Sequence, residues 1–258
     1  MFGLRRHAHP LPPPIEPIAW DLDAGPPPLP GQLDAVVYAV APRGSDEAAY
    51  RQAYLSGFER LAEGLRLAGA RPDRLLFVSS TGVHDQDGGV WVDESSPAEP
   101  ASPAHRALRD GERRAAAHGA VTLRLAGIYG PGRAGLVERV RSGAVRLPLG
   151  PTYTNRIHRD DCAGALLHLL LAPAPEPLYL GVDHEPADQR EVVAWIAAQL
   201  GCALPAAGAG VDPQRPRGSK RCSNARLVGS GYTFSYPTYR DGYAPLIADA
   251  LAATAAGR

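Results

Sequence analysis

The sequence lacks several features that would place it in a class at once. Its three cysteines, Cys162, Cys202 and Cys222, are far apart and form no C-x-x-C pair, which argues against both a disulfide framework and a zinc site. Lys plus Arg equals Asp plus Glu at 27 each, so no overall field draws the chain to nucleic acid or to an anionic membrane. No apolar run approaches the ~20 residues of a membrane helix, and the N-terminus has no signal-peptide core. These absences predict a soluble, cytoplasmic protein without a metal site.

Strand and helix patterns alternate along the 258 residues. Apolar and β-branched runs predict strands at 15–20, 33–42, 75–78, 121–125 and 178–182. Helical spacing and capping signals predict helices at 47–68, 103–118, 136–141, 160–171 and 188–200. The glycine-rich stretch 126–132 predicts a turn, and 215–243 shows little periodicity. This alternation predicts an α/β fold with a doubly wound, mostly parallel sheet.

The stretch 75–84, LLFVSSTGVH, ends a predicted strand in a run of hydroxyls. Four apolar residues without alternation are typical of a strand that is covered on both faces. Ser79, Ser80 and Thr81 then fall at its carboxyl end, where open α/β sheets place their ligands. An ordinary serine-rich turn is an equal alternative from these residues alone.

Four motifs occur in a fixed order: V-S-S-T-G-V-H at 78–84, D-E-x-x-P at 93–97, L-R-L-A-G-I-Y-G-P-G at 123–132 and N-R-I-H-R-D-D at 155–161. Together with S-K-R-C-S-N-A-R-L at 219–227 and Y-P-T-Y-R-D-G-Y at 236–243, they resemble the atypical and extended short-chain dehydrogenase/reductases, the NAD(P)-dependent epimerase/dehydratase superfamily. The resemblance spans nearly the whole chain. It implies one Rossmann-like NAD(P)-binding domain over 1–258, to which 132–160 and 183–243 contribute a small C-terminal substrate lobe.

The resemblance also implies catalytic candidates at the hydroxyl-rich strand end. Ser80 lies in the column of the family's catalytic serine or threonine, which holds the reacting oxygen of the substrate. Thr81 could hold it from the next position. His84, where many relatives carry tyrosine, is a further candidate that faces the substrate.

The family's proton-transfer pair, a tyrosine with a lysine four residues later, has no counterpart here. Glu112 matches a glutamate that is common in the family downstream of this pair. Counted back from it, the positions of the tyrosine and the lysine are occupied by Ala104 and Leu108, and neither side chain can donate or accept a proton. His105 and Arg109 repeat the spacing one position later, but that register turns the pair by about 100° around the helix. We therefore interpret His105 as a surface residue of the helix.

The resemblance implies a nicotinamide cofactor and assigns it eight residues: Arg5, Arg6, Asp21, Leu22, Ala39, Ala41, Ser79 and Tyr129. By this resemblance, Asp21 binds the adenine amino group and Leu22 lines the adenine ring. Ala39 and Ala41 are small enough to let the ribose and the pyrophosphate approach closely. Arg5 and Arg6 face the 2′-phosphate of NADP, which favours NADP over NAD, because a guanidinium fork suits a phosphate. From the residues alone, a solvated charge pair is the preferred interpretation of the two arginines.

The start of the chain departs from the family pattern. Members open with a strand, a G-x-G-x-x-G turn and a helix that binds the pyrophosphate. Here the stretch 2–6 resembles the end of the second strand, so the first βα unit is expected to be missing. In the strand order 3-2-1-4-5-6 that unit supplies a central strand. A translation start further upstream, with the glycine loop encoded there, is an open alternative.

Two functions follow from these residues. The first is an NAD(P)-dependent oxidoreductase or epimerase that acts on a small oxygenated substrate, such as a sugar or a nucleotide sugar. The second is a non-catalytic NAD(P)-binding or regulatory protein that has lost the tyrosine and lysine. The implied partner is a small molecule and neither nucleic acid nor a membrane, and a homodimer is compatible with the resemblance.

Two charged clusters remain open to more than one interpretation. His158 with Asp160 and Asp161 could suggest metal ligation, but the resemblance makes them the structural start of a helix. The basic tail either binds a phosphate-bearing substrate or is solvated; its members are Arg215, Arg217, Lys220, Arg221 and Arg226.

Overall fold

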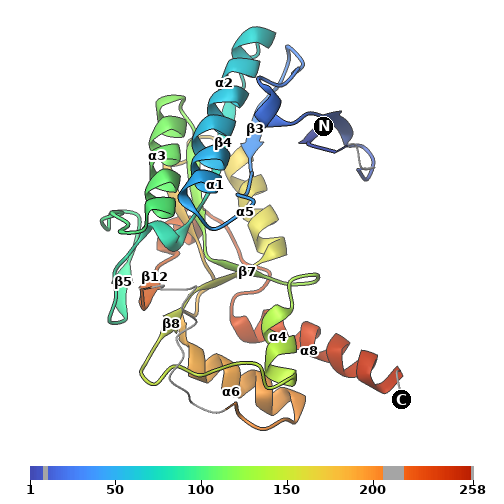
Figure 1. The fold of residues 1–258 in the computed structure, drawn as a ribbon, viewed down its shortest axis with the longest axis vertical. Coiled ribbons are helices and arrows are strands. Elements are labelled where there is room, and N and C mark those ends of the chain that lie inside the picture. The colour runs from blue at the N-terminus through green and yellow to red at the C-terminus, as the bar shows by residue number, and fades with distance from the viewer. Residues whose placement is uncertain (8–10, 206–217, 257–258) are drawn as a thin grey trace. The chain divides into compact units, whose positions relative to one another are not determined.

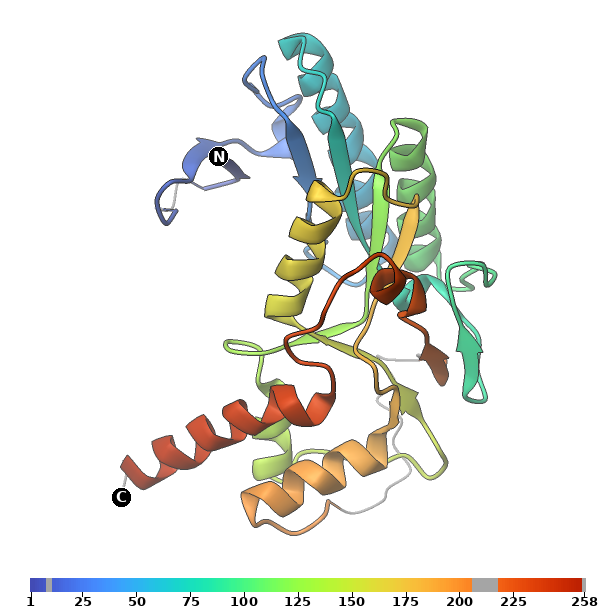
Figure 2. The same ribbon diagram turned by 180° about the vertical axis from the view of Figure 1, so that it is seen from behind.

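The computed structural model describes residues 1–7, 11–205 and 218–256 (Figures 1 and 2). The chain forms two compact units: unit 1 is Met1–Ser79 with Pro100–Thr122, and unit 2 is Ser80–Glu99 with Leu123–Arg258. Two members of the basic tail, Arg215 and Arg217, lie outside the described residues. The single domain and the lobe at 132–160 and 183–243 stay predictions.

The strands are β1 (Phe2–Arg5), β2 (Glu16–Ala19), β3 (Ala35–Tyr38), β4 (Arg74–Ser80), β5 (Val90–Val92), β6 (Val121–Leu125), β7 (Gly127–Tyr129), β8 (Tyr153–Thr154), β9 (Arg156–His158), β10 (Leu178–Gly181), β11 (Ala187–Asp188) and β12 (Lys220–Cys222). The helices are α1 (Glu47–Arg51), α2 (Gly57–Ala68), α3 (Pro103–Ala117), α4 (Gly135–Arg141), α5 (Arg159–Leu171), α6 (Gln189–Leu200), α7 (Ala225–Gly229) and α8 (Tyr239–Ala256). Short helical turns are η1 (Leu22–Ala24), the π-helical η2 (Gln52–Ser56) and η3 (Thr81–Val83).

The central sheet has the strand order β10-β6-β4-β3. β3 is parallel to β4, with Val36 opposite Leu75, and the two strands run side by side in Figure 2. β1 and β2 form a separate parallel pair, with Phe2 opposite Glu16, and in the described part of the chain this pair does not join the central sheet. The mostly parallel sheet with its helices confirms the predicted α/β fold class.

The predicted helix at 47–68 forms, but it is interrupted by the π-helical turn η2. The hydroxyl of Tyr38 donates to the backbone oxygen of Ala53, at 2.5 Å, and this accounts for one carbonyl of the widened turn. Gly57 leaves room for that hydroxyl, because a Cβ there would lie 2.5 Å from it. The tyrosine therefore ties β3 to the helix that follows it.

α3 packs closely against η2 within unit 1 (Figure 1). A Cβ at Gly111 would lie 2.7 Å from the backbone oxygen of Tyr54, so only glycine permits this approach. Phe77 of β4 contacts Tyr38 and Phe58, each with ring centroids 5.6 Å apart. These contacts cover one face of β3 and β4 with helices.

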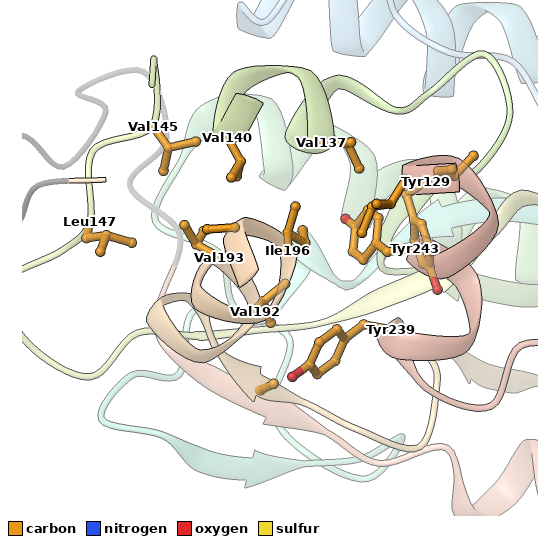
Figure 3. Packing of buried hydrophobic residues seen from close by; sticks show 14 residues of the cluster. Tyr129, Val137, Val140, Val145, Leu147, Val192, Val193, Ile196, Tyr239 and Tyr243 are labelled. Atoms are coloured by element: carbon orange, nitrogen blue, oxygen red, sulfur yellow. The ribbon is translucent and has the colours of Figure 1, made fainter. Parts of the chain in front are cut away.

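An apolar cluster of unit 2 joins α4, α6 and α8 (Figure 3). Tyr129 stacks on Tyr243 with ring centroids 4.4 Å apart, and Trp195 meets Tyr239 edge to face at 5.8 Å. Aliphatic side chains fill the space between these rings; they include Val137, Val140, Val192, Val193 and Ile196. The beginning of α8 is thus part of the core and not a loose tail.

Two segments differ from the sequence-based expectation. The stretch 126–132, predicted as a turn, contains β7, which pairs in parallel with β9 so that Tyr129 lies opposite His158. The stretch 215–243, without evident periodicity, contains β12, α7 and the start of α8. In both cases the partner is remote in sequence, so local residue preferences carry no trace of it. Among the described residues, no helix is long and apolar enough to cross a membrane.

Candidate functional site

A cavity of about 460 Å³ in unit 1 collects most of the predicted cofactor residues. Five of the eight line it: Arg5, Arg6, Asp21, Leu22 and Ala41. Trp20, Arg43 and Gln52 line it as well. The structure therefore brings together residues that are up to 47 positions apart in the sequence.

Parallel pairing explains why these residues meet. β1 ends at Arg5, which lies opposite Ala19 at the end of β2, and the backbone N–H of Trp20 donates to the oxygen of Arg5 at 2.9 Å. The carboxyl ends of parallel strands lie at the same edge of a sheet. Arg6, just after β1, and Asp21, two residues after the end of β2, therefore start from the same edge of the strand pair.

The carboxylate of Asp21 lines the cavity and lies close to three polar groups. It accepts a hydrogen bond from the backbone N–H of Asp23 at 3.0 Å and lies 2.7 Å from Nε of Arg6. Arg43 Nη2 is 4.0 Å from the same carboxylate. The Asp23 hydrogen bond, followed by the charge of Arg6, lowers the pKa of Asp21. Sequence reasoning missed Arg43, whose only signal is its place two residues after Ala41 in the segment that follows β3.

Ser79 points toward α3 within unit 1. Its hydroxyl donates to Glu112 Oε1 at 2.5 Å, and Glu112 Oε2 lies 3.1 Å from Arg109 Nη1. Ser79 and Glu112 are both buried, so this network fixes the end of β4 to the helix. Ser79 does not line the cavity, and neither does Ala39.

Ser80 and Thr81 begin unit 2 at the η3 turn. Ser80 is half-buried, and its Oγ accepts from the backbone N–H of Gly82 at 3.1 Å. No acceptor for its own hydroxyl proton is found in the described part of the chain. Thr81 is buried, and its backbone oxygen accepts from His84 N at 3.2 Å. Ser80 is thus the more exposed hydroxyl of this pair.

His84 is fully buried, and both of its ring nitrogens are engaged. Arg124 Nη1 lies 2.9 Å from His84 Nε2, and because arginine only donates, this nitrogen accepts. Nδ1 then carries the proton and donates to the backbone oxygen of Pro97 at 3.2 Å. The structure places His84 as a link between β6 and the loop after β5.

Tyr129 lies in the core of unit 2. Its ring is 3% exposed and stacks on Tyr243, while its hydroxyl approaches the backbone oxygen of Thr238 at 3.5 Å. Burial raises the pKa of Tyr129 well above its usual value. Tyr129 is absent from the lining of the unit 1 cavity, and its cofactor role stays a prediction.

The columns of the missing proton-transfer pair face the interior of unit 1. Ala104 is 7% exposed and Leu108 is fully buried, so both serve the packing of α3. His105 is half-buried and meets Tyr50 edge to face, with ring centroids 5.9 Å apart. It is therefore a packing residue rather than a solvated one.

Asp161 and Asp183 are buried aspartates of unit 2 whose carboxylates accept different numbers of hydrogen bonds. Asp161 is 1% exposed and accepts hydrogen bonds from the hydroxyl of Tyr232 and the backbone N–H groups of Ser235 and Tyr236, at 2.9, 2.8 and 2.9 Å. Asp183, also 1% exposed, accepts one, from Glu185 N at 3.1 Å, and among the described residues its Oδ2 has no partner. Burial raises the pKa of Asp183 to about 7.

Sequence reasoning missed Asp183. Its only signal is its place in a charged segment directly after a predicted strand.

Replacing Asp183 by asparagine should flatten the pH dependence of folding stability. The folded-state pKa of about 7 lies above the ordinary value of 3.8, so the folded protein binds the proton more tightly than the unfolded chain. Stability from this group is therefore fully present below about pH 4 and is lost as the pH rises through 7, by about 3 kcal/mol between about pH 5 and pH 8. Urea unfolding across that range measures the slope.

The matched control is Asp161→Asn, which removes a well-bonded carboxylate. It should destabilise the protein and leave most of the slope between about pH 5 and pH 8 in place, because burial, and not the charge of Asp161, is the main cause of the raised pKa of Asp183. An Asp183→Asn variant with the wild-type slope would contradict the assignment.

Comparison with known proteins shows which solved structures share this architecture. No protein-family model matches the chain, and no curated protein matches it. A solved structure from Methylobacillus flagellatus, described as an NAD-dependent epimerase/dehydratase, is 31% identical over 97% of this chain and 89% of that chain, with a TM-score of 0.78.

Two more distant structures share the fold. MoeE5 in complex with UDP-glucose and NAD is 20% identical over 98% of this chain and 91% of that one, with a TM-score of 0.80. The human epimerase family protein SDR39U1 with NADPH is 18% identical over 95% of this chain and 89% of that one, with a TM-score of 0.77. On the fold, the ordered motifs and the identity to the Methylobacillus flagellatus protein, the chain belongs to the NAD-dependent epimerase/dehydratase family of the short-chain dehydrogenase/reductases.

Proposed function

We propose that the protein binds NADP(H), with the adenosine end of the cofactor in the unit 1 cavity. The observation that carries the proposal is the gathering of Arg5, Arg6, Asp21, Leu22 and Ala41 around that one cavity. These residues come from the ends of three strands, which is where α/β sheets hold nucleotides. Family membership supports a nicotinamide dinucleotide, and the cavity residues support this particular place for its adenosine end.

The donor set of the cavity fits an adenosine that carries a phosphate. Arg6 and Arg43 are exposed guanidinium groups that lie 2.7 and 4.0 Å from the same oxygen of Asp21, and Arg5 adds a third guanidinium to the lining. A guanidinium binds phosphate oxygens through two parallel N–H groups, and the 2′-hydroxyl of NAD offers no such charge. The carboxylate of Asp21, with its lowered pKa, is an acceptor for an amino group such as that of adenine. This set favours NADP over NAD, although structures with NADPH and with NAD both occur in this fold.

Arg6→Gln and Arg43→Gln should each weaken NADPH binding by roughly tenfold and change NADH binding little, because a charge-assisted hydrogen bond contributes about 1.5–3 kcal/mol. Trp20 lines the cavity and supplies the fluorescence signal for the titration. Arg66→Gln is the control, because Arg66 is an exposed arginine of unit 1 that pairs with Glu63 at 2.6 Å and does not line this cavity. Equal losses for both nucleotides, or no binding of either at about 1 mM, would refute the proposal.

Hydride transfer is a second candidate function, favoured by Ser80. Its Oγ accepts the Gly82 N–H, and the hydroxyl proton is left to bind the oxygen of a small oxygenated substrate. A bound nicotinamide supplies or accepts the hydride. Ala104 and Leu108 provide no proton, and this observation favours the alternative of a non-catalytic NADP(H)-binding or regulatory protein. A sugar or nucleotide sugar is the proposed substrate class, and UDP-glucose occurs in the MoeE5 structure.

Ser80→Ala should lower turnover by roughly a hundredfold and leave NADPH affinity unchanged, because it removes one hydrogen bond to the reacting oxygen. The assay follows NADPH absorbance with carbonyl compounds and sugar nucleotides. An unchanged rate in the variant would refute the role of Ser80. NADPH binding without turnover in the wild-type protein would favour the non-catalytic alternative.

The proposed location is the cytoplasm. All three cysteines are free thiols, and Cys162 and Cys222 are buried. Free thiols are typical of proteins in a reducing compartment.

A further inference from the structure

Arg221 lies between two aromatic rings of unit 2. β12 pairs in parallel with β5, so that Arg221 is opposite Trp91, and β8 lies next to β12 (Figure 1). The guanidinium carbon is 5.2 Å from the ring centroid of Trp91 and 4.7 Å from that of Tyr153. Both distances are those of cation–π contacts.

Further contacts fix the orientation of this guanidinium. Arg221 Nε donates to the backbone oxygen of Gly89 at 2.6 Å. Tyr153 packs directly on Gly89, where a Cβ would lie 2.7 Å from the ring, and Tyr153 N donates to Ser219 Oγ at 2.9 Å. Because the side chain is already held, little rotamer entropy remains to be lost when a ligand binds.

The two Nη groups at the end of the Arg221 guanidinium can donate hydrogen bonds to another molecule. Within the described residues, neither Nη atom of Arg221 has a hydrogen-bond acceptor. Asp87, an acidic residue in the loop before β5, is bound by the backbone N–H groups of Ser219 and Gly88, which lower the pKa of its carboxyl group. Trp91 is 58% exposed, so an accessible aromatic surface lies beside the guanidinium.

We propose that Arg221 and Trp91 form a binding site for a small-molecule oxyanion, a phosphate or carboxylate attached to a planar ring. The two Nη groups bind two oxygens of the anion in the plane of the guanidinium. The ring packs on the exposed part of Trp91. The site goes beyond NADP(H) binding and does not depend on it. For one member of the basic tail it favours binding over solvation, because a merely solvated arginine would not be held by two rings and a carbonyl.

The test is a titration of the ¹⁵N-labelled full chain, followed by the NMR signals of the arginine Nε–H and tryptophan Nε1–H groups. The probes are inorganic phosphate, benzoate and phenyl phosphate. Phosphate and benzoate should bind with millimolar affinity, and phenyl phosphate roughly three- to tenfold more tightly than phosphate because its ring contacts Trp91.

Variants assign the binding to its residues. Arg221→Gln should weaken all three probes by roughly tenfold or more, and Arg221→Lys, which keeps the charge without the fork, should weaken them less. Trp91→Leu should weaken benzoate and phenyl phosphate, whose rings pack on Trp91, more than inorganic phosphate. Arg141→Gln is the control, since Arg141 is an exposed arginine of α4 that pairs with Glu138 at 2.9 Å.

Three results would overturn the proposal. One is the absence of saturable shifts with any probe at about 10 mM. Another is equal binding by the wild-type, Arg221→Gln and Arg221→Lys proteins. The third is a loss of folding stability in Arg221→Gln without any change in the titrations, which would make the arginine only a structural link between β5 and β12.

Discussion

Parallel pairing of short strands is the constraint on which the candidate cofactor site depends. β1 and β2 run in the same direction, so their ends emerge at one edge, and the Arg6 guanidinium meets the Asp21 carboxylate at 2.7 Å. An exposed ion pair of this kind contributes little to stability, because water and salt screen it. Its importance is positional, since it holds an acceptor and a donor on one cavity wall.

The groups that the proposed function uses are present only in part. The Oγ of Ser80 accepts one backbone N–H, and acidic and basic side chains line the unit 1 cavity. Ala104 and Leu108 fill the columns of the proton-transfer pair with apolar side chains that pack in the interior. The proposed cofactor binding therefore does not depend on the proton-transfer pair, because none of the cavity residues belongs to that pair.

The sequence predicts well the elements whose signal is local. The strand at β4 follows from an unbroken apolar run, and the α/β class follows from alternation. β7 was not predicted, because its partner strand β9 is distant in sequence and the residues of β7 are themselves typical of a turn. The burial of His84 and the single hydrogen bond of Asp183 also depend on tertiary neighbours, which no local pattern records. The resemblance identified five residues that line the cavity but not Arg43, which follows β3 without a motif of its own.

The central claim is that the cavity of unit 1 binds the adenosine end of NADP(H). Calorimetric titration with adenosine 2′,5′-bisphosphate, compared with adenosine 5′-monophosphate, tests this claim without the nicotinamide half or any catalytic step. We expect saturable binding of the bisphosphate that is roughly tenfold tighter than that of the monophosphate, since only the bisphosphate carries the 2′-phosphate that the arginines bind. Equal affinity for the two nucleotides, or binding of neither, would contradict it.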